Sequence, residues 1–480
     1  MATAGTYLPE SMLIKLNAGV PFFNELAMEC AEPTEEGCEE QIQETRKITA
    51  VDHGYLFHEY LHFLHNISTP SGLAALINQI ELWRCFRLTV APGGFSQGSG
   101  CLDQATLQHV RVLSSYLNAM RVDGTCSKLK YVMTPARLDI VSVASQVDVA
   151  GPTETLLTKL VCKAKVYDGD DNHEECTVEV KTQEIMECIA WRLEKQLVYG
   201  MDPDSPFDTP KVFPYRVVEA LVRCMIPDID EETILYCAMA SLQSTDAPAA
   251  LYELLTFVAA ASKQTPEHRL EQLRAMASQA TEQSSVILET SFRNLENEFS
   301  SHNRMASAIR EVMSVSRDAL ESRLGDPVFE LALLDDIISL PESFQSRIAE
   351  ITPCSVLQER DGPEDRVGRD LLVSFREKGG PKAGSAESAL RVLHCLFHFL
   401  RAHMRAGEGF ERTERISATC PFFTCCTLPL RTAEPDLCRK TPWRAVNGNG
   451  PDAPASLCWY GAGVHLTRPP MAAGGTSQTA

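Results

Sequence analysis

The residues of this chain that are best placed to do chemistry are His58, Glu59 and His62, which form an H-E-x-x-H pattern. Two histidines four residues apart lie on one face of a helix, about one turn from each other, so both imidazoles can reach one ion. Imidazole is a preferred protein ligand of Zn²⁺, and a glutamate beside the pair can take a proton from water at the ion. The pattern therefore predicts a metal centre that activates water, with His58 and His62 as ligands and Glu59 as the general base.

The surrounding residues indicate that this pattern lies on a buried helix. Asp52 is expected to be the N-cap residue, and the breaker sequence at residues 68–72 is expected to end the helix near Asn66. Apolar side chains between these ends supply the buried surface: Tyr55, Leu56, Phe63 and Leu64. The competing interpretation is an ordinary amphipathic helix that carries two histidines. A third ligand decides between the two, because a catalytic zinc usually has three protein ligands.

Two glutamates are candidates for that third ligand, Glu187 and Glu81. His65 is excluded, because seven residues along a straight helix separate it from His58 by about 10 Å. Glu81 follows His62 after 18 intervening residues. Glu187 is more distant in the sequence, so it would have to come from a separate helix that packs against the first.

At the H-E-x-x-H motif the chain resembles the zincin metallopeptidases, which hydrolyse peptide bonds with a zinc-activated water. The resemblance implies that His58 and His62 bind Zn²⁺, that Glu59 is the general base, and that the substrate is a peptide or protein. It also implies a zincin-like core, in which Glu-zincins take the third zinc ligand from a second helix.

Both glutamates have a counterpart in this resemblance. The spacing of Glu81 is similar to that of some Glu-zincins, whereas the sequence around Glu187 resembles the second Glu-zincin helix, in which a small residue follows the ligand after three positions. Ala190 occupies that position, and with Cys188 it would let two helices pack closely. Glu187 is therefore the preferred ligand and Glu81 stays open. The alternative for Glu187 is an exposed helix charge paired with Arg192.

The expected reaction is hydrolysis of a peptide bond, with Glu59 removing a proton from the attacking water and passing it to the leaving amine. A tyrosine or histidine normally stabilises the oxyanion in such sites, and Tyr199 is one candidate. The competing hypothesis is a non-enzymatic helical scaffold, or a protein-interaction module, with a structural or vestigial metal site at His58 and His62.

A second candidate metal site lies near the C-terminus, where five cysteines fall in a short, proline-rich stretch: Cys420, Cys425, Cys426, Cys438 and Cys458. All of these except Cys426 form a set of four thiolates that could hold a structural zinc ion or an iron–sulfur cluster. Their spacing does not match two C-x-x-C pairs. Reduced, buried cysteines packed with Trp443 and Trp459 are therefore an equally good interpretation.

The composition excludes several classes of partner. The 480 residues carry a formal net charge of −20, which argues against a nucleic-acid backbone or an anionic membrane surface as the main partner. No uninterrupted apolar run approaches 20 residues, so no membrane-spanning helix is expected. The 17 cysteines are mostly scattered singly, as in a reduced cytosolic protein, which predicts a cytoplasmic location.

The patterning predicts an α+β protein that is mainly helical, with a small antiparallel sheet and a long helical C-terminal part, and the resemblance implies a zincin-like core within it. The sheet is expected at Leu138–Val147, Leu157–Val166 and Cys176–Val180, and residues 360–385 are expected to form an exposed loop. Four regions follow: a zincin-like metal-binding core at 1–200, a helical region at 201–410, a Cys-rich segment at 411–467 and a disordered tail at 468–480.

Overall fold

The fold is that of a computed structural model, whose described residues are 5–8, 13–18, 48–91, 94–119, 137–150, 155–167, 173–207, 210, 212–261, 264–298, 303–352, 354–363, 365–375, 383–405, 409–446 and 458–468. The predicted disordered tail lies outside these residues, except for Arg468.

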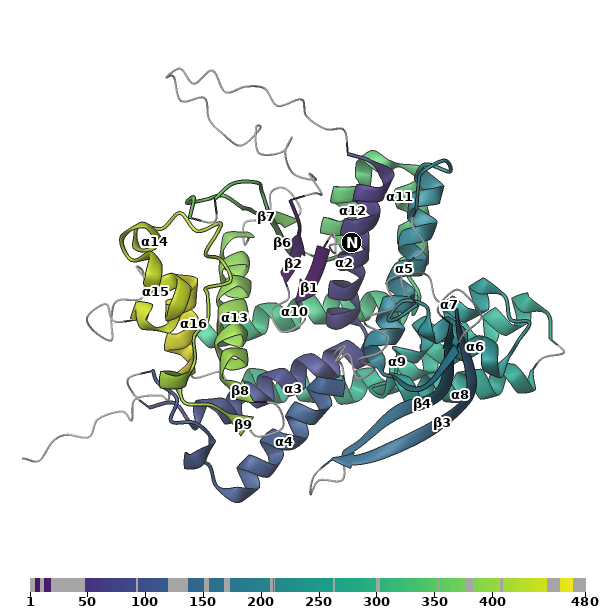
Figure 1. The fold of residues 1–480 in the computed structure, drawn as a ribbon, viewed down its shortest axis with the longest axis horizontal. Helices are drawn as coiled ribbons and strands as arrows, with labels where there is room; N and C mark the ends of the chain where they lie inside the picture. The colour runs from purple at the N-terminus through teal and green to yellow at the C-terminus, as the bar shows by residue number, and fades with distance from the viewer. Residues whose placement is uncertain are drawn as a thin grey trace, which may run out of the picture.

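The helix that carries the H-E-x-x-H pattern is α2, Ala50–Ser68, and it packs along α5, Thr182–Met201, near the middle of the molecule (Figure 1). Its N-cap is Thr49, and the prediction of Asp52 was wrong. The Thr49 hydroxyl accepts the Asp52 N–H at 3.2 Å, while the Asp52 carboxylate accepts the Thr49 N–H at 2.9 Å. This reciprocal capping box satisfies two N–H groups at once, and Asp52 therefore sits inside the first turn.

The next helix, α3 (Pro70–Arg87), follows α2 with only Thr69 between them. The N–H of Thr69 donates to the carbonyl oxygen of His65 at 3.1 Å, and its hydroxyl accepts the N–H of Gly72 at 3.1 Å. A Cβ atom at Gly72 would lie 2.3 Å from the His65 oxygen, so this turn requires glycine. The helix α4, Gln104–Ala119, then packs on α3.

The predicted three-stranded sheet is confirmed as β3 (Leu138–Ala150), β4 (Thr155–Tyr167) and β5 (His173–Val180). The strands are antiparallel in the order β3-β4-β5. Buried side chains alternate along β4 at Leu160, Cys162 and Ala164, as expected for a sheet with one face toward the core. The long β3–β4 hairpin extends along one side of the molecule (Figure 1).

A second sheet lies beside α2 and was not predicted. Its strands are β1 (Gly5–Leu8), β2 (Leu13–Leu16), β6 (Cys354–Gln358) and β7 (Leu371–Phe375), in the order β1-β2-β6-β7. The β2–β6 pair is parallel and the outer pairs are antiparallel. The expectation of an exposed loop at 360–385 was wrong at β7, because its apolar residues pair with β6 in register. The sheet therefore joins the start of the chain to a segment more than 300 residues later.

Most of the chain after α5 is helical, as predicted, and the helices are α6 (Val217–Met225), α7 (Glu231–Ser241), α8 (Ala247–Ala260), α9 (Pro266–Glu298), α10 (Asn303–Gly325), α11 (Glu330–Ser339) and α12 (Phe344–Ile351). One buried polar contact fixes α10 against α2. The guanidinium of Arg323 donates to the hydroxyl of Ser68 at 2.8 Å and to the carbonyl oxygen of Pro327 at 3.0 Å.

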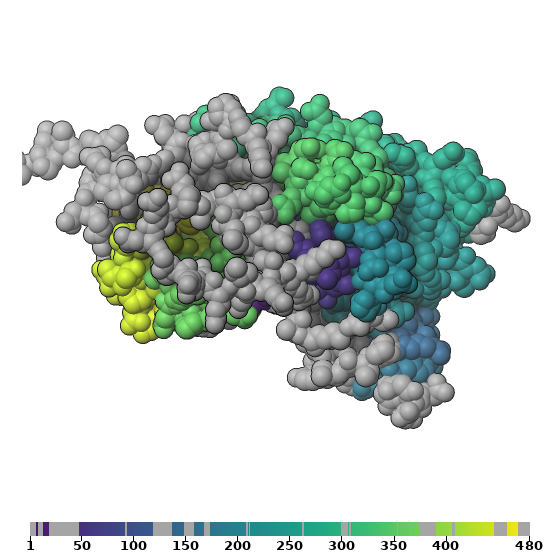
Figure 2. Space-filling model, turned by 90° about the horizontal axis from the view of Figure 1, so that it is seen from above, coloured from purple at the N-terminus to yellow at the C-terminus, as the bar shows by residue number. Residues whose placement is uncertain are grey.

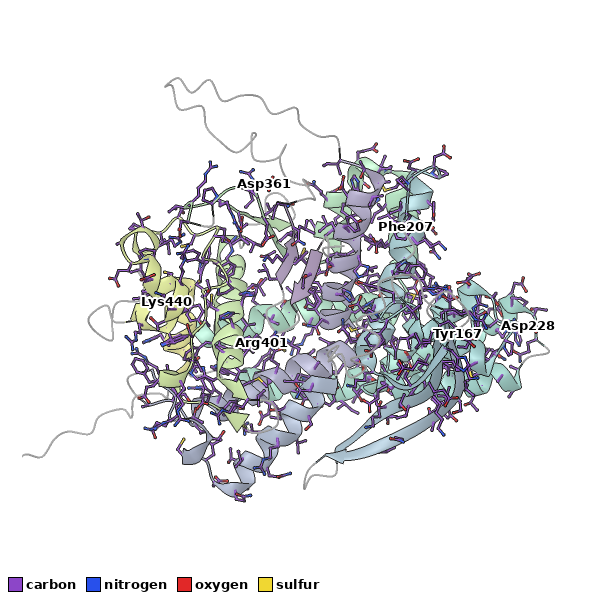
Figure 3. All side chains as sticks on the ribbon, viewed as in Figure 1. Tyr167, Phe207, Asp228, Asp361, Arg401 and Lys440 are labelled. Atoms are coloured by element: carbon purple, nitrogen blue, oxygen red, sulfur yellow. The ribbon has the colours of Figure 1, made fainter. Side chains whose placement is uncertain are left out.

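The last part of the chain packs against α13, on the opposite side of the view from α5 (Figure 1). Its elements are α13 (Ala383–His403), β8 (Met404–Arg405), β9 (Gly409–Phe410), α14 (Pro429–Ala433), α15 (Pro435–Lys440) and α16 (Trp459–Thr467). Single 3-10 turns occur at Ser99–Cys101, Pro341–Ser343, Thr413–Arg415 and Pro442–Val446. The label on Lys440 marks the end of α15 in Figure 3.

The predicted fold class, a mainly helical α+β protein with small antiparallel strands, is confirmed. Within the described residues, no helix combines the length and the apolar content that crossing a membrane would require.

Candidate metal centre

The helix α5 approaches α2 closely because Gly54 has no side chain. A Cβ atom at Gly54 would lie 2.6 Å from Cγ2 of Val198 and 3.2 Å from Cγ of Glu194. On α5, Glu187, Ala190 and Glu194 recur at intervals of three and four residues, which places them on one face of the helix. Ala190 is fully buried. Small residues on both helices thus allow the close packing that the sequence around Glu187 predicted.

This packing brings Glu187 to the two histidines of the motif. Nε2 of His58 lies 3.2 Å from Nε2 of His62, and Oε2 of Glu187 lies 3.3 Å from each of these nitrogens. The side chains are only 10%, 6% and 13% exposed, in the order His58, His62 and Glu187. We call these three residues the His58 group. Figure 2 shows the neighbouring surface of α2 and α5, flanked by α11 and α12 in green.

The donor atoms of the His58 group have the spacing that a tetrahedral zinc ion requires. Zinc binds imidazole nitrogen and carboxylate oxygen at about 2.0–2.1 Å, so neighbouring ligands of a tetrahedron lie roughly 3.3 Å apart. The three separations, 3.2, 3.3 and 3.3 Å, match this value. The residues therefore fit a divalent ion with two nitrogen ligands and one oxygen ligand, which leaves a fourth position for water or substrate.

Two further side chains on α5 orient the His58 group. Oε2 of Glu194 lies 2.8 Å from Nδ1 of His58, so Nδ1 donates its proton to this carboxylate and Nε2 is the ring nitrogen that faces Glu187 and His62. Nε2 of Gln183 donates to Oε1 of Glu187 at 2.9 Å, which directs the other carboxylate oxygen to the histidines. Hydrogen bonds to the atoms that point away from the group thus hold His58 and Glu187 in an orientation that suits metal binding.

The charge balance of the site favours a cation. Burial disfavours the imidazolium form of His58, but the carboxylates of Glu194 and Glu187 outweigh it and raise the pKa of His58 well above its ordinary value. Burial likewise disfavours ionised Glu187, yet His62 and His58 lower the pKa of Glu187. Several carboxylates face two imidazoles here, and this arrangement favours positive charge at this point, as protons or as a metal ion.

Glu59 is 9% exposed and lies beside the His58 group, against strand β1. Burial raises the pKa of Glu59, while His58, His62 and the backbone N–H of Tyr7 act in the opposite direction. A raised pKa suits a carboxylate that takes up a proton and releases it again near neutral pH.

A tyrosine that the sequence did not single out faces the site. The ring of Tyr215 packs edge-on against His58, with 5.9 Å between ring centroids. Burial raises the pKa of Tyr215, with Glu187 adding to the effect, so its phenol stays neutral and can donate a hydrogen bond. Tyr199 lies twelve residues beyond Glu187, about 18 Å along α5, and packs on Phe207 at 6.0 Å (Figure 3). Tyr199 is therefore far from the His58 group.

The other candidate ligand, Glu81, belongs to a separate group of three with Cys85 and His109. We call it the His109 group. Its donor atoms lie within 4.8 Å of one another, as do those of the His58 group. The Glu81 carboxylate is also paired with Arg84 at 3.4 Å, and the His109 side chain is 39% exposed. In the part of the chain that the structure describes, these are the two groups of this kind.

His65 lies apart from the His58 group, as the helix geometry predicted. Its Nε2 is 3.2 Å from Oε1 of Glu330, and both side chains are 1% exposed. Arg192, the alternative partner for Glu187, instead pairs with Glu219 at 3.2 Å and with Glu231.

The C-terminal cysteines come together in another part of the molecule. One cavity is lined by four of them: Cys420, Cys426, Cys438 and Cys458. Cys425, which the sequence placed in the set in preference to Cys426, donates its thiol to the carbonyl oxygen of Phe422 at 3.5 Å and does not line the cavity. All five are free thiols. Of the adjacent residues Cys425 and Cys426, only Cys426 lines the cavity, because the turn after Cys420 directs its side chain inward.

Sequence reasoning missed several residues of the metal centre, and their signals differ. Glu194 follows Glu187 after seven residues, two helical turns, so helical periodicity places it on the same face. Gln183 precedes Glu187 by four residues and is found by the same rule. Tyr215 lies in an irregular segment before α6, and Tyr7 lies in β1, so no periodicity points from either of them to α2.

Comparison with known proteins adds no further assignment: no family model matches the chain, and no curated protein or solved structure is significantly similar to it.

Proposed function

We propose that the chain is a zinc-dependent metallopeptidase, in which the His58 group holds the ion and Glu59 is the general base. The observation that carries the proposal is the spacing of 3.2–3.3 Å among the three donor atoms, with Glu59 buried beside them. The motif on α2 and the ligand glutamate on a second, closely packed helix support a resemblance to the Glu-zincins. Free thiols at all described cysteines support a reducing compartment such as the cytoplasm.

A bound zinc ion supplies Lewis acidity, which polarises a peptide carbonyl and makes water a nucleophile near neutral pH. The chain itself moves the proton. Glu59 accepts it from the attacking water at its carboxylate and then delivers it to the leaving amine. The carboxyl group of Glu59 holds the proton between these two steps.

The remaining residues position the reactants. Tyr215 stays a neutral phenol, so its O–H can donate to the oxyanion that forms when water adds to the carbonyl carbon. Glu194 fixes the tautomer of His58 throughout, and Gln183 fixes the carboxylate of Glu187.

A scaffold with a structural ion accounts for the His58 group but not for Glu59. A structural zinc site is normally closed by four protein ligands, whereas this group offers three. A buried carboxylate that binds no ion also costs folding free energy. A peptidase accounts for both the three-ligand group and the buried Glu59. The fourth position would bind the attacking water, and Glu59 would take its proton.

The test is the substitution Glu59→Gln, which keeps size and hydrogen bonding but removes the base. Wild type, Glu59→Gln and the control Glu81→Gln are loaded with zinc and assayed on a library of fluorescence-quenched peptides of random sequence. We expect Glu59→Gln to keep its zinc and to lose roughly 10²–10⁴-fold in cleavage rate, while Glu81→Gln cleaves like wild type. Zinc-loaded wild type that cleaves no peptide, or Glu59→Gln that cleaves as fast as wild type, would contradict the proposal.

A further inference from the structure

The cavity lined by Cys420, Cys426, Cys438 and Cys458, here called the thiol cavity, gathers residues from three separate segments. The backbone of Cys420 donates to the carbonyl oxygen of Cys438 at 2.8 Å, which joins the first two segments. A tight turn, with the N–H of Cys426 donating to the carbonyl of Phe422 at 2.9 Å, brings Cys426 back beside Cys420. The third segment contributes Cys458, the N-cap of α16. Four thiols converge here although up to 38 residues separate them in sequence.

The walls of the thiol cavity are otherwise apolar and aromatic. Phe422, Trp459 and Tyr460 line it beside the thiols, and the ring of Phe422 packs edge-on against Trp459 at 5.1 Å. The cavity volume is about 30 Å³, whereas one water molecule needs roughly 10–15 Å³. A group larger than a single water therefore fits between the sulfur atoms, in largely apolar surroundings.

Backbone N–H groups point at the sulfur atoms. The N–H of Gly461 donates to Sγ of Cys458 at 3.3 Å, and Tyr460 donates to the same sulfur. The N–H of Phe422 donates to the sulfur of Cys420. A neutral thiol is a weak acceptor, whereas a thiolate on a metal is a strong one, and such N–H···S bonds tune the metal centres they surround. The backbone is thus arranged for ionised sulfur.

The surroundings favour the neutral thiol at Cys420 and Cys438. Burial raises the pKa of Cys438 to about 11, and burial together with the neighbouring sulfurs raises the pKa of Cys420 well above its ordinary value. Within the described residues the sulfurs also do not form a group within 4.8 Å of one another. Four thiolates on one zinc ion lie roughly 3.8 Å apart, because each Zn–S bond is about 2.3 Å. A cluster of several irons binds each thiolate to a different iron and holds the sulfurs further apart.

A bound metal would also crosslink the surrounding segment. Its helices α14 and α15 have only five and six residues, so they depend on tertiary contacts rather than on their own stability. A metal bound to several cysteines contributes its binding free energy to the folding of such a segment. The thiol cavity lies where the three chain segments meet, so a metal bound there would link all three.

We propose that Cys420, Cys426, Cys438 and Cys458 bind an iron–sulfur cluster. The site lies beside α13 and α16, across the molecule from α2 and α5 (Figure 1). A test of the cluster therefore gives a result that does not depend on the peptidase proposal. Cys425 is adjacent in sequence, but its thiol donates to the backbone carbonyl of Phe422 and does not line the cavity, which makes it a matched control for Cys426.

The full chain is purified without oxygen and reconstituted with ferrous iron and sulfide, and its iron, acid-labile sulfide, zinc and visible absorption are measured. We expect wild type and Cys425→Ala to hold several irons and an equal number of sulfides per chain, with broad visible absorption. Cys426→Ala and Cys438→Ala should lose most of all three. Wild type without iron and sulfide, or with one zinc ion on these four thiolates, overturns the proposal.

Two further outcomes are also decisive. If Cys426→Ala does not fold, the iron and sulfide content of wild type and of Cys425→Ala alone decides the question. Equal loss of the cluster from Cys425→Ala and Cys426→Ala, with both variants folded, counts against the assigned ligands. The double variant His58→Ala/His62→Ala should keep the cluster, which separates this result from the zinc site.

Discussion

The His58 group and the His109 group contain the same number of metal-ligating side chains. They differ in the neighbouring residues that hydrogen-bond or pair with these side chains. In the His58 group, Glu194 binds the far nitrogen of His58 at 2.8 Å and Gln183 holds the second oxygen of Glu187 at 2.9 Å. In the His109 group, the carboxylate of Glu81 is instead paired with Arg84, whose side chain is 48% exposed.

This difference shows that residue types within reach of one another do not suffice for a metal site. The cation of Arg84 competes for the same carboxylate that a metal would need, and Arg84 is itself paired with Glu298 at 3.0 Å. The exposed imidazole of His109 would also lose side-chain entropy on binding. The His58 group avoids both costs, because its ligands are already buried and oriented.

The largest expected effect separates the two groups directly. Glu187→Ala removes an oriented ligand, so zinc affinity should fall by more than about 100-fold, beyond the effect of losing a supporting residue. Glu81→Ala should leave affinity within about twofold of wild type. Competition against a chelator, with one zinc ion per chain, measures both. Equal losses in the two variants would show that the groups do not differ as described.

The next effect distinguishes two tyrosines. Tyr215→Phe removes the phenol that faces His58, and loss of one oxyanion donor typically lowers kcat by about 10²–10³-fold. Tyr199→Phe, at a position of α5 far from His58 and packed on Phe207, should leave kcat unchanged. Steady-state kinetics on a cleaved peptide gives kcat and KM for each. A Tyr215→Phe variant with wild-type kcat would remove Tyr215 from the mechanism.

A smaller effect tests Glu194, whose carboxylate hydrogen-bonds to His58. Glu194→Gln keeps a side chain of equal size but weakens the hydrogen bond to Nδ1 of His58, so zinc affinity should fall by about 10–100-fold. Among the residues that the structure describes, His109 has no counterpart of Glu194. Its neighbour Gln108 therefore serves as a control, and Gln108→Ala should have no effect. Unchanged affinity in a folded Glu194→Gln variant would mean that His58 needs no orienting partner.

The smallest effect concerns His65, the fourth histidine of α2, whose partner Glu330 also pairs with Arg323. Despite burial, Arg323 and His65 lower the pKa of Glu330 to about 2, and burial lowers the pKa of His65. Both folded-state values lie below the unfolded ones, so each contribution is complete above the unfolded pKa and is lost as pH falls. Urea unfolding should therefore show falling stability below about pH 6.5, and more steeply between about pH 4 and pH 2.

Glu330→Gln should be less stable at neutral pH and should flatten the steeper, more acidic part of that curve. A curve for Glu330→Gln that runs parallel to wild type throughout would contradict the role given to this carboxylate.

Sequence patterning predicted a long helix such as α9 because its buried residues recur every three or four positions on one face. The helix α2 was found from its apolar content instead, since it is buried on all sides from Leu56 to Ser68. The first two ligands followed from residue type and spacing within a single helix. Glu187 followed from local context, since a small residue on the same face indicates close helix packing.

Long-range pairing explains what the sequence could not show. The β2–β6 pair joins Leu13 to Ser355, and no local pattern records such a partner. Tyr215 reaches His58 from an irregular segment, where no helical or strand period applies. The choice between Cys425 and Cys426 depends on the direction of one turn, which adjacent positions in a sequence do not reveal.

The most direct test of the metal centre is anomalous diffraction, recorded above and below the zinc absorption edge, from crystals of the chain with bound zinc. The account predicts a zinc peak about 2.0–2.2 Å from Nε2 of His58, Nε2 of His62 and a carboxylate oxygen of Glu187. No peak between these three residues, or zinc found only between Glu81, Cys85 and His109, would contradict it.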